Sequence, residues 1–179
     1  MRGTYWDYAS ETKNLTKEGN IPFQNGKKPL AMLRRIVEMQ PRNDIKVADF
    51  FAGSSSTAHA VLAANAEDGG SRRFIMVQLP ERGAASEAGF ENVAELSRER
   101  IRRAGRQIVD GECHESWSKD VGFRTLKIDT SNMADVYYAP DALDKAKFDL
   151  FVDNIKPDRT PEDLLFQVML DWGVDLALP

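Results

Sequence analysis

The sequence predicts an α/β protein in which helices pack on a doubly wound, mostly parallel sheet. Two short apolar runs, at residues 45–51 and 72–79, are expected to be strands, and an alanine-rich segment between them is expected to be a helix. A strand, a helix and a second strand within about thirty residues form the right-handed crossover unit of a parallel sheet. A further helix at 89–108 and a third apolar run at 123–129 repeat the alternation.

A helix is also expected before the first strand. Pro29 suits the first helical position and Pro41 closes the segment. Between them, four apolar residues recur at helical spacing: Leu30, Leu33, Ile36 and Val37. The run at 72–79 is almost continuously apolar, which is typical of a strand buried on both faces.

Three parts are predicted along the chain. Residues 1–26 are polar with scattered aromatic side chains, and we expect an extended arm without its own core. Residues 27–132 form the α/β part. Residues 133–179 form a helical C-terminal appendage, with helices at 139–155 and 160–173.

The last predicted helix has clear start and stop signals. Thr160 is expected to be the N-cap, with Pro161 at the first helical position, Asp163 three residues after the cap and Gly173 as the stop. Its apolar positions are Leu164, Leu165, Val168 and Met169. Such a face is either ordinary core or a docking surface for another subunit, and exposed apolar area decides between them.

Composition indicates a folded globular chain without an overall attraction to nucleic acid. The 179 residues are 42% hydrophobic and 29% charged, with a net charge of −4. Any basic surface is therefore local. The arginine cluster at 98–106 either contacts phosphate or forms a solvated, ion-paired helix face. Glu95 and Glu99 at helical spacing favour the second interpretation.

The sequence lacks the ligands for a structural metal site and any segment that would cross a membrane. Cys113 is the single cysteine, and the only histidines are His59 and His114. His59 is expected to have a packing or surface role. No apolar run approaches the roughly 20 residues that a bilayer requires, and the first ten residues have no signal-peptide core. We therefore expect a cytoplasmic protein.

The stretch DFFAGSSSTAHAVL, residues 49–62, is the candidate ligand-binding turn. It follows the first predicted strand, and ligands of parallel α/β sheets bind at the carboxyl ends of the strands. Backbone amides at the start of the following helix favour an anion. The turn has neither the lysine of a phosphate-binding loop nor the three glycines of a dinucleotide fingerprint, which argues against a nicotinamide-dependent oxidoreductase.

A ligand with a carboxylate beside an ammonium group needs fewer glycines. Asp49 at the strand end is placed to face the ammonium, and Glu81 after the next strand is placed to accept the hydroxyls of a ribose. An amino acid joined to a nucleoside describes S-adenosylmethionine. In the alternative interpretation, Gly53 only turns the chain and Glu81 is a solvated carboxylate. The pattern alone leaves both open.

Several collinear motifs resemble one enzyme family. The segments FQNGKKPLAMLRRIVE (23–38) and VADFFAGSSSTAHAVLAANAEDGGSRRFIMVQLPE (47–81) resemble the DNA adenine-N6 methyltransferases, in particular the modification (Mod) subunits of type III restriction-modification systems. ERIRRA, GFRTLKIDTSN and LFVDNIKPDRTPEDLLFQVMLDWG extend the resemblance over most of the chain from Ile21 onward. It implies a partial, Rossmann-like methyltransferase fold and S-adenosylmethionine as methyl donor.

The resemblance also implies a set of cofactor-binding residues. They are Lys28, Pro29, Asp49, Phe50, Phe51, Ala52, Gly53, Ser54, Ser55, Thr57, Gln78, Leu79 and Glu81. The turn would hold the methionine part, Glu81 the ribose, and Gln78 and Leu79 the adenine side. Ser55 departs from the family pattern, which has a second glycine there. A side chain at this position crowds the cofactor or requires a backbone angle that glycine adopts more easily.

The family's catalytic Asp-Pro-Pro-Tyr loop has no counterpart in this sequence. That loop holds the adenine amino group and stacks on the flipped base. We therefore expect no catalytic residue here, and expect the chain to be the C-terminal, cofactor-binding part of such an enzyme, inactive alone. DNA, through the complete enzyme, and a second Mod subunit or a restriction subunit are the implied partners. The alternative is a non-catalytic module of a restriction-modification complex that keeps the methyltransferase fold.

Overall fold

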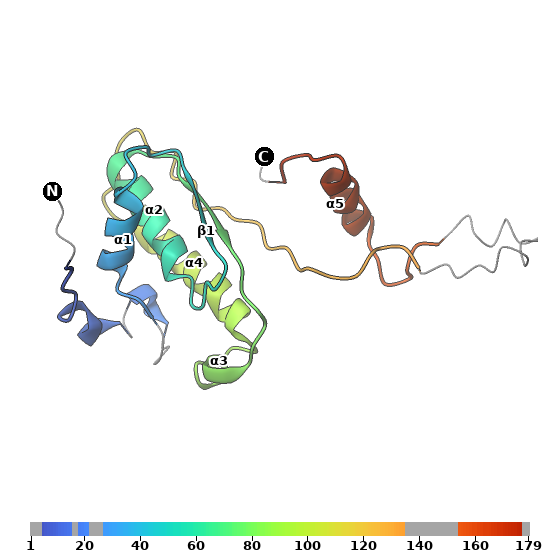
Figure 1. Ribbon diagram of the computed structural model, residues 1–179, viewed down its shortest axis with the longest axis horizontal. Helices are drawn as coiled ribbons and strands as arrows, with labels where there is room; N and C mark the ends of the chain where they lie inside the picture. The colour runs from blue at the N-terminus through green and yellow to red at the C-terminus, as the bar shows by residue number, and fades with distance from the viewer. Residues whose placement is uncertain (1–4, 16–17, 22–26, 135–153, 177–179) are drawn as a thin grey trace, which may run out of the picture. The chain divides into compact units, whose positions relative to one another are not determined.

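The computed structural model describes residues 5–15, 18–21, 27–134 and 154–176. The chain divides into two units, Met1–Gly122 and Phe123–Pro179, and each is described by itself. The elements of the first unit are η1 (Glu11–Asn14), η2 (Glu18–Asn20), α1 (Leu30–Glu38), β1 (Lys46–Asp49), α2 (Ser56–Asp68), β2 (Arg73–Met76), α3 (Gly83–Glu87) and α4 (Val93–Val109), as Figure 1 shows. The second unit contains α5 (Pro161–Asp171).

β1 and β2 are parallel neighbours, and α2 connects them. Lys46 lies opposite Arg73, and Asp49 lies opposite Met76. The predicted strand, helix and strand are therefore confirmed. Both strands are shorter than the apolar runs that predicted them, since β1 ends in a turn after Asp49 and β2 ends at Met76. In the described residues the sheet has two strands, so the doubly wound arrangement stays a prediction.

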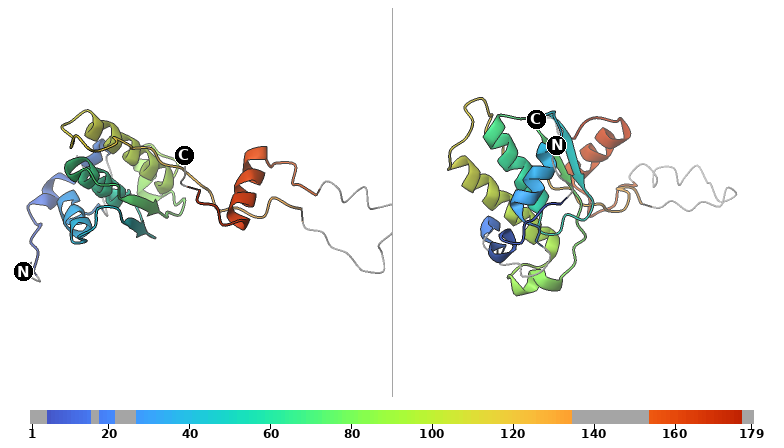
Figure 2. Two further views of the ribbon diagram at one scale, coloured as in Figure 1. Left: turned by 90° about the horizontal axis from the view of Figure 1, so that it is seen from above. Right: turned by 60° about the vertical axis from the view of Figure 1, so that its left-hand side comes forward.

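One face of the strand pair packs against the helices. Val47 of β1 and Phe74 of β2 contact a buried cluster formed by Val37 of α1 with Val61 and Ala64 of α2. Figures 1 and 2 show α2 lying between α1 and α4, beside the strands. The sheet is thus covered from one side by a layer of helices.

The other face of the strand pair is open in the described residues. Ile75 is 54% exposed and Val77 is 38% exposed. The prediction that residues 72–79 are buried on both faces is therefore wrong for this structure. Successive side chains of a strand point to opposite faces, so every second residue points away from the only helical layer described.

A second cluster fixes α4. Val93 and Leu96 of α4 pack with Ile21 and Ala85, and the fully buried Ile21 comes from the segment between η2 and α1. Asn92 caps the helix by accepting a hydrogen bond from the backbone N–H of Glu95 at 2.9 Å. The predicted helix at 89–108 is confirmed, beginning a few residues later than its sequence pattern.

The third predicted strand, at residues 123–129, does not form. This segment has no strand assignment in the described part of the second unit. Leu126 is 56% exposed and Ile128 is 95% exposed. A strand needs a neighbouring strand to pair its backbone N–H and C=O groups. None of the described residues of this unit is fully buried, so the apolar side chains of 123–129 have no core to pack against. An apolar pattern alone therefore does not establish a strand.

α5 forms as predicted. Thr160 is the N-cap, accepting from the N–H of Asp163 at 3.2 Å, and Asp163 accepts from the N–H of Thr160 at 2.8 Å, which completes a capping box. Met133 and Ile155 make an isolated antiparallel bridge. The predicted helix at 139–155 lies almost wholly outside the described residues. Leu165, on the predicted apolar face, is 57% exposed.

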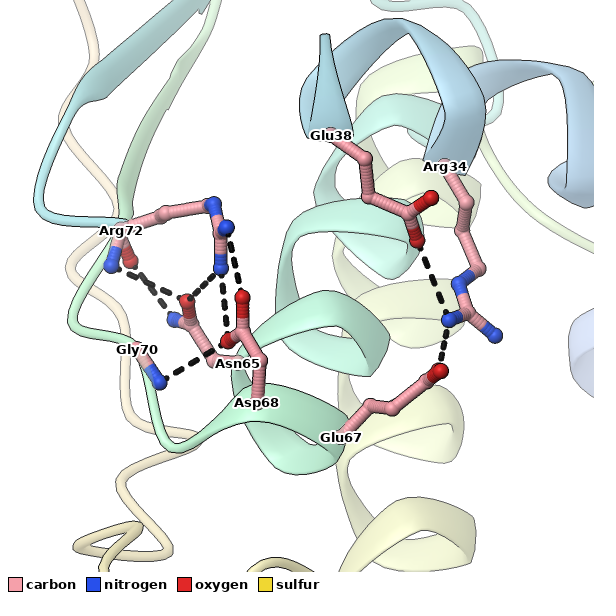
Figure 3. Close-up of polar contacts among 7 residues, drawn as sticks. All are labelled: Arg34, Glu38, Asn65, Glu67, Asp68, Gly70 and Arg72. Carbon is pink, nitrogen blue, oxygen red and sulfur yellow. Dashed lines mark hydrogen bonds and ion pairs between the residues drawn. The ribbon is translucent and has the colours of Figure 1, made fainter. Parts of the chain in front are cut away.

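Polar side chains join the end of α2 to the start of β2 (Figure 3). Asn65 accepts from the N–H of Arg72 at 3.0 Å and donates to its carbonyl oxygen at 2.8 Å. The Arg72 guanidinium donates to both carboxylate oxygens of Asp68, at 2.9 and 2.7 Å, and Asp68 also accepts from Gly70 N–H at 3.0 Å. The short connection between α2 and β2 is therefore held by side chains from both of its ends.

A second contact in Figure 3 joins α1 to α2. The Arg34 guanidinium lies between Glu38 of its own helix, at 3.2 Å, and Glu67 of α2. The side chains of Glu38 and Glu67 are 39% and 64% exposed, so these ion pairs contribute little to stability.

His59 is a buried histidine in the middle of the helical layer. It is 6% exposed, and its Nδ1 has no hydrogen-bond partner among the described residues. Burial lowers the pKa of His59 to about 4, and the positive charges of Arg100 and Arg34 lower it further in the same direction. The ring is therefore neutral at neutral pH. Of the packing and surface roles expected for His59, its burial supports packing.

Replacing Asn65 tests the α2–β2 junction. In Asn65→Ala, the N–H and carbonyl oxygen of Arg72 lose their partner while they remain enclosed, so we expect the free energy of unfolding to fall by about 2–4 kcal/mol. Urea denaturation followed by circular dichroism measures the loss. Arg42→Ala, which removes an exposed ion pair with Asp44, is the control and should leave the midpoint unchanged. Equal behaviour of the two variants would show that the junction carries no stability.

The buried His59 predicts a specific acid sensitivity. The folded pKa of about 4 lies below the ordinary 6.5, so the unfolded chain takes up the proton first as the pH falls. Stability is then lost from pH 6.5 down to 4, and we expect a drop of about 2 kcal/mol between pH 7 and pH 5. In His59→Gln this part of the slope should disappear, whatever the absolute stability of the variant. An unchanged slope between pH 7 and 5 would contradict the neutral buried ring.

Candidate functional site

The bend between β1 and α2 lies at the carboxyl ends of both strands. The backbone pairing continues into it, because Val77 N–H donates to the Asp49 carbonyl oxygen at 2.9 Å and Ala52 N–H donates to the Val77 carbonyl oxygen at 3.1 Å. The first residues of the bend are thus held against the chain that leaves β2. The parallel topology places the predicted turn and the 77–81 segment side by side.

Asp49 organises the start of the bend. One carboxylate oxygen accepts from Phe51 N–H at 3.1 Å, and the other accepts from the hydroxyl of Thr57 in the first turn of α2 at 2.6 Å. Asp49 therefore joins the strand end to the helix start. Each carboxylate oxygen has a second lone pair, so the group keeps acceptor capacity for a ligand.

Gln78 holds the bend from the neighbouring strand. Its side-chain oxygen accepts from Gly53 N–H at 2.7 Å, and its amide nitrogen donates to the Leu79 carbonyl oxygen at 3.0 Å. Gly53 has φ +53°, and among the described residues a methyl group built there meets only the Phe51 carbonyl oxygen, at 4.0 Å. The space beside Gly53 is therefore open.

The three serines of the bend point into the protein. Ser54, Ser55 and Ser56 are 4%, 0% and 5% exposed. Ser55 has φ 55° and ψ 39°, which is left-handed, and its hydroxyl is hydrogen-bonded to the hydroxyl of Ser97 in α4. Ser54 accepts from Arg100 of the same helix at 3.0 Å.

Four of the expected cofactor residues are exposed around the bend. Phe50 and Phe51 are 68% and 87% exposed, Leu79 is 66% exposed, and Glu81 is exposed. Ala52 is buried beneath them. Phe50, Phe51, Leu79 and Glu81 thus belong to the two segments that follow β1 and β2, which are joined by hydrogen bonds of Val77 and Gln78.

The expected Lys28–Pro29 pair lies at the start of α1. Pro29 is buried and is the N-cap, one position earlier than predicted, while Lys28 is exposed. The N–H of Leu30 donates to both carboxylate oxygens of Glu18, each at 3.3 Å. An acidic side chain from the N-terminal segment therefore satisfies the positive end of this helix.

Sequence reasoning missed a buried network behind the bend. Arg100 is 0% exposed, and its guanidinium lies 3.8 Å from the Glu18 carboxylate. Lys27 is 7% exposed and donates to the carbonyl oxygens of Leu15 at 2.9 Å and of Ile21. Burial and the nearby positive charge of Arg100 lower the pKa of Lys27 to about 8. The partners of Arg100 are Ser54 and Glu18, which lie tens of residues away in the sequence, so no local pattern marks this buried cation.

The arginines on the outer side of α4 are ion-paired. Glu99 lies 2.8 Å from Arg103, 3.5 Å from Arg106 and 3.8 Å from Arg102. This favours the solvated, ion-paired face over a phosphate-binding one. Within residues 5–15, 18–21, 27–134 and 154–176, no group of three acidic, histidine or cysteine side chains is placed to hold a metal ion. The helices described there are too short or too polar to span a membrane.

Comparison with known proteins identifies the family of the chain. Residues 1–104 match the family model described as DNA methylase. The match begins at residue 1, so it includes the N-terminal segment that the motif resemblance left out. More than half of the chain lies within the matched range.

Curated relatives include two Mod subunits of type III restriction-modification enzymes and a type II methyltransferase. The chain is 37% identical over 135 residues to the type III restriction-modification enzyme StyLTI Mod subunit of Salmonella typhimurium, a match that covers 70% of this chain and 20% of that protein. It is 30% identical over 124 residues to the EcoP15I Mod subunit of Escherichia coli, covering 67% of this chain and 18% of that protein. The type II methyltransferase M.KpnI of Klebsiella pneumoniae is 29% identical over 116 residues, covering 60% and 28%.

The chain spans about a fifth of the length of the Mod subunits that it matches. Its sequence motifs, the parallel strand pair with a bend at the carboxyl ends, and the match over residues 1–104 agree with one another. The chain belongs to the DNA methylase family and is similar to the Mod subunits of type III restriction-modification enzymes.

Proposed function

We propose that this chain is the S-adenosylmethionine-binding part of a site-specific DNA adenine-N6 methyltransferase. The observation that carries the proposal is the bend after β1. It is fixed by Asp49 and Gln78 and is open beside Gly53. A turn held open at the carboxyl ends of parallel strands is where α/β proteins bind ligands.

The residues at the bend fit the chemical groups of this cofactor. The Asp49 carboxylate faces an ammonium group, and backbone N–H groups at the start of α2 favour a carboxylate. Glu81 is an exposed carboxylate that accepts from the two ribose hydroxyls. Phe51 and Leu79 offer apolar surface for adenine. Lys28 and Pro29 border the site from the segment before α1.

Gln78 shapes the bend, because its side chain is engaged with Gly53 N–H and the Leu79 carbonyl oxygen. Its place on the adenine side stays a prediction. Ser54 acts through the backbone, because its side chain is buried against α4. The direct side-chain contacts are therefore assigned to Asp49, Phe51, Leu79 and Glu81.

Methyl transfer requires residues that this sequence does not contain. The cofactor supplies a methyl group on a sulfonium sulfur, and the adenine amino group must be held in line with it. The Asp-Pro-Pro-Tyr loop that does this in the family has no counterpart among the 179 residues. We propose that the complete enzyme, with DNA and a second Mod or a restriction subunit as partners, is needed for activity.

The alternative of a fold-only interaction module depended on Ser55. Its hydroxyl contacts Ser97 in the interior instead of occupying the space beside Gly53. This supports cofactor binding, since a side chain directed inward leaves the outer side of the bend free.

Asp49 is the residue to change first. We expect the isolated chain to bind S-adenosylmethionine weakly, and Asp49→Asn to weaken binding by about tenfold or more, because the charge facing the ammonium is lost. Chemical-shift titration of the 15N-labelled chain measures both constants. Asp44→Asn, at the opposite end of β1, is the matched control and should bind as the unaltered chain does. Equal affinity of the two variants would remove Asp49 from the site.

The absent catalytic loop predicts an inactive chain. With tritiated S-adenosylmethionine and a mixed-sequence DNA, we expect no label to enter the DNA, because nothing in the chain orients the target adenine. Label in the DNA above the level of a boiled sample would contradict this.

The chemical-shift titration of the 15N-labelled chain, repeated with NAD, should show no shifts at the bend, since the dinucleotide glycines are missing.

A further inference from the structure

Ser55 occupies a backbone conformation that a serine rarely adopts. Its φ of 55° and ψ of 39° are left-handed, a region that disfavours residues with a Cβ atom. An N-cap serine normally has an extended backbone and bonds its hydroxyl to the first turn of the helix. Ser55 does neither, because it makes no side-chain cap. The left-handed angle at Ser55 is therefore not stabilised by a side-chain cap on α2.

The compensating contact comes from α4. The hydroxyl of Ser55, which is 0% exposed, is hydrogen-bonded to the hydroxyl of Ser97, which is 5% exposed. Two buried hydroxyl groups thus satisfy each other. A change of the Ser55 backbone to a common φ and ψ would break this hydrogen bond and leave each hydroxyl without the other as a partner. The contact therefore favours the left-handed angle.

Arg100 makes the neighbouring contact from the same helix. It follows Ser97 by three residues, so the two side chains lie on one face of α4. Arg100 is 0% exposed and donates to the Ser54 hydroxyl at 3.0 Å. Two consecutive residues of the bend are therefore held from behind by two residues of one helix face.

Arg100 also connects the bend to the start of α1. Its guanidinium lies 3.8 Å from the carboxylate of Glu18, and that carboxylate accepts from Leu30 N–H. Leu30 directly follows the Lys28–Pro29 pair. One buried arginine thus contacts the bend directly and the start of α1 through Glu18.

We infer that Ser97 and Arg100 are positioning residues of the cofactor site. They hold Ser54 and Ser55 inward, set the left-handed angle at Ser55, and so keep the Gly53 side of the bend open. This inference rests on the proposed function for the identity of the ligand. The positioning itself is a property of the free chain.

The test uses glycine rescue in the whole chain. The variants are Ser97→Ala, Ser55→Gly and the double variant. Ser97→Ala removes the contact that holds the left-handed angle, whereas glycine adopts that angle without a partner. If the Ser55–Ser97 contact sets the backbone angle of residue 55, Ser55→Gly should restore the angle that Ser97→Ala disturbs. Loss of packing alone would not be restored in this way.

The first measurement needs no cofactor. In Ser97→Ala, we expect the backbone carbon shifts of residue 55 to move away from left-handed values. We also expect the Ser55 and His59 amides to exchange about tenfold faster, as a lost hydrogen bond predicts. In the double variant, exchange at His59 should return to within about twofold of the unaltered chain. Unchanged shifts and exchange in Ser97→Ala would overturn the inference.

The second measurement is cofactor affinity by the same titration. We expect S-adenosylmethionine to bind about five- to tenfold more weakly to Ser97→Ala, and with near-original affinity to the double variant. Failure of the glycine to restore affinity would overturn the positioning role.

A matched pair tests Arg100. Arg100→Lys keeps the charge but loses the planar fork that reaches Ser54 and Glu18, so weaker cofactor binding is expected. Arg106→Lys, at a 70% exposed side chain of the same helix, should bind normally. Equal affinities of these two variants would remove Arg100 from the positioning role.

If the unaltered chain shows no cofactor binding, the proposed function fails. The backbone carbon shifts of residue 55 still decide whether α4 holds the bend.

Discussion

The parallel pairing of β1 with β2 is the constraint on which the rest of the structure depends. Parallel strands cannot be joined by a tight turn, so the chain must cross the sheet between them, and α2 is that crossover. Most of α2 is buried, including Ala58, Ala60, Ala64 and Ala66. Small side chains let α1, α4 and the strands approach it from several directions. The bend before α2 is consequently fixed at the carboxyl end of β1.

The polar groups around the bend act from two sides. Asp49 and Gln78 hold its backbone from the sheet, while Ser97 and Arg100 hold its side chains from α4. A loop held in one shape before the ligand arrives loses less conformational entropy on binding. A buried cation is costly unless its charge is compensated. Glu18 offsets part of the charge of Arg100, and carbonyl oxygens accept hydrogen bonds from the ammonium group of Lys27.

The sequence predicted those elements whose signals are local. β1, β2, α2 and α5 followed from apolar runs, an alanine-rich segment and a capping box, all visible within a dozen residues. The segment 123–129 has the same kind of apolar pattern but forms no strand in the described part of the chain, since pairing depends on distant residues that a local pattern does not contain. The contact between Ser55 and Ser97 joins residues 42 positions apart, and that between Arg100 and Ser54 joins residues 46 apart. Neither contact can be recognised from a pattern of neighbouring residues in the sequence.

Ser55 shows why a departure from a family motif cannot be judged from the residue alone. Read as a sequence, a serine in place of glycine suggests crowding of the ligand or backbone strain. In the structure, the strain is present but the crowding is not, because the left-handed angle directs the side chain toward α4, where Ser97 bonds to it. The same angle that makes the serine unfavourable thus keeps the space beside Gly53 open. Whether position 55 tolerates a side chain is therefore decided on α4, by the residue that faces it.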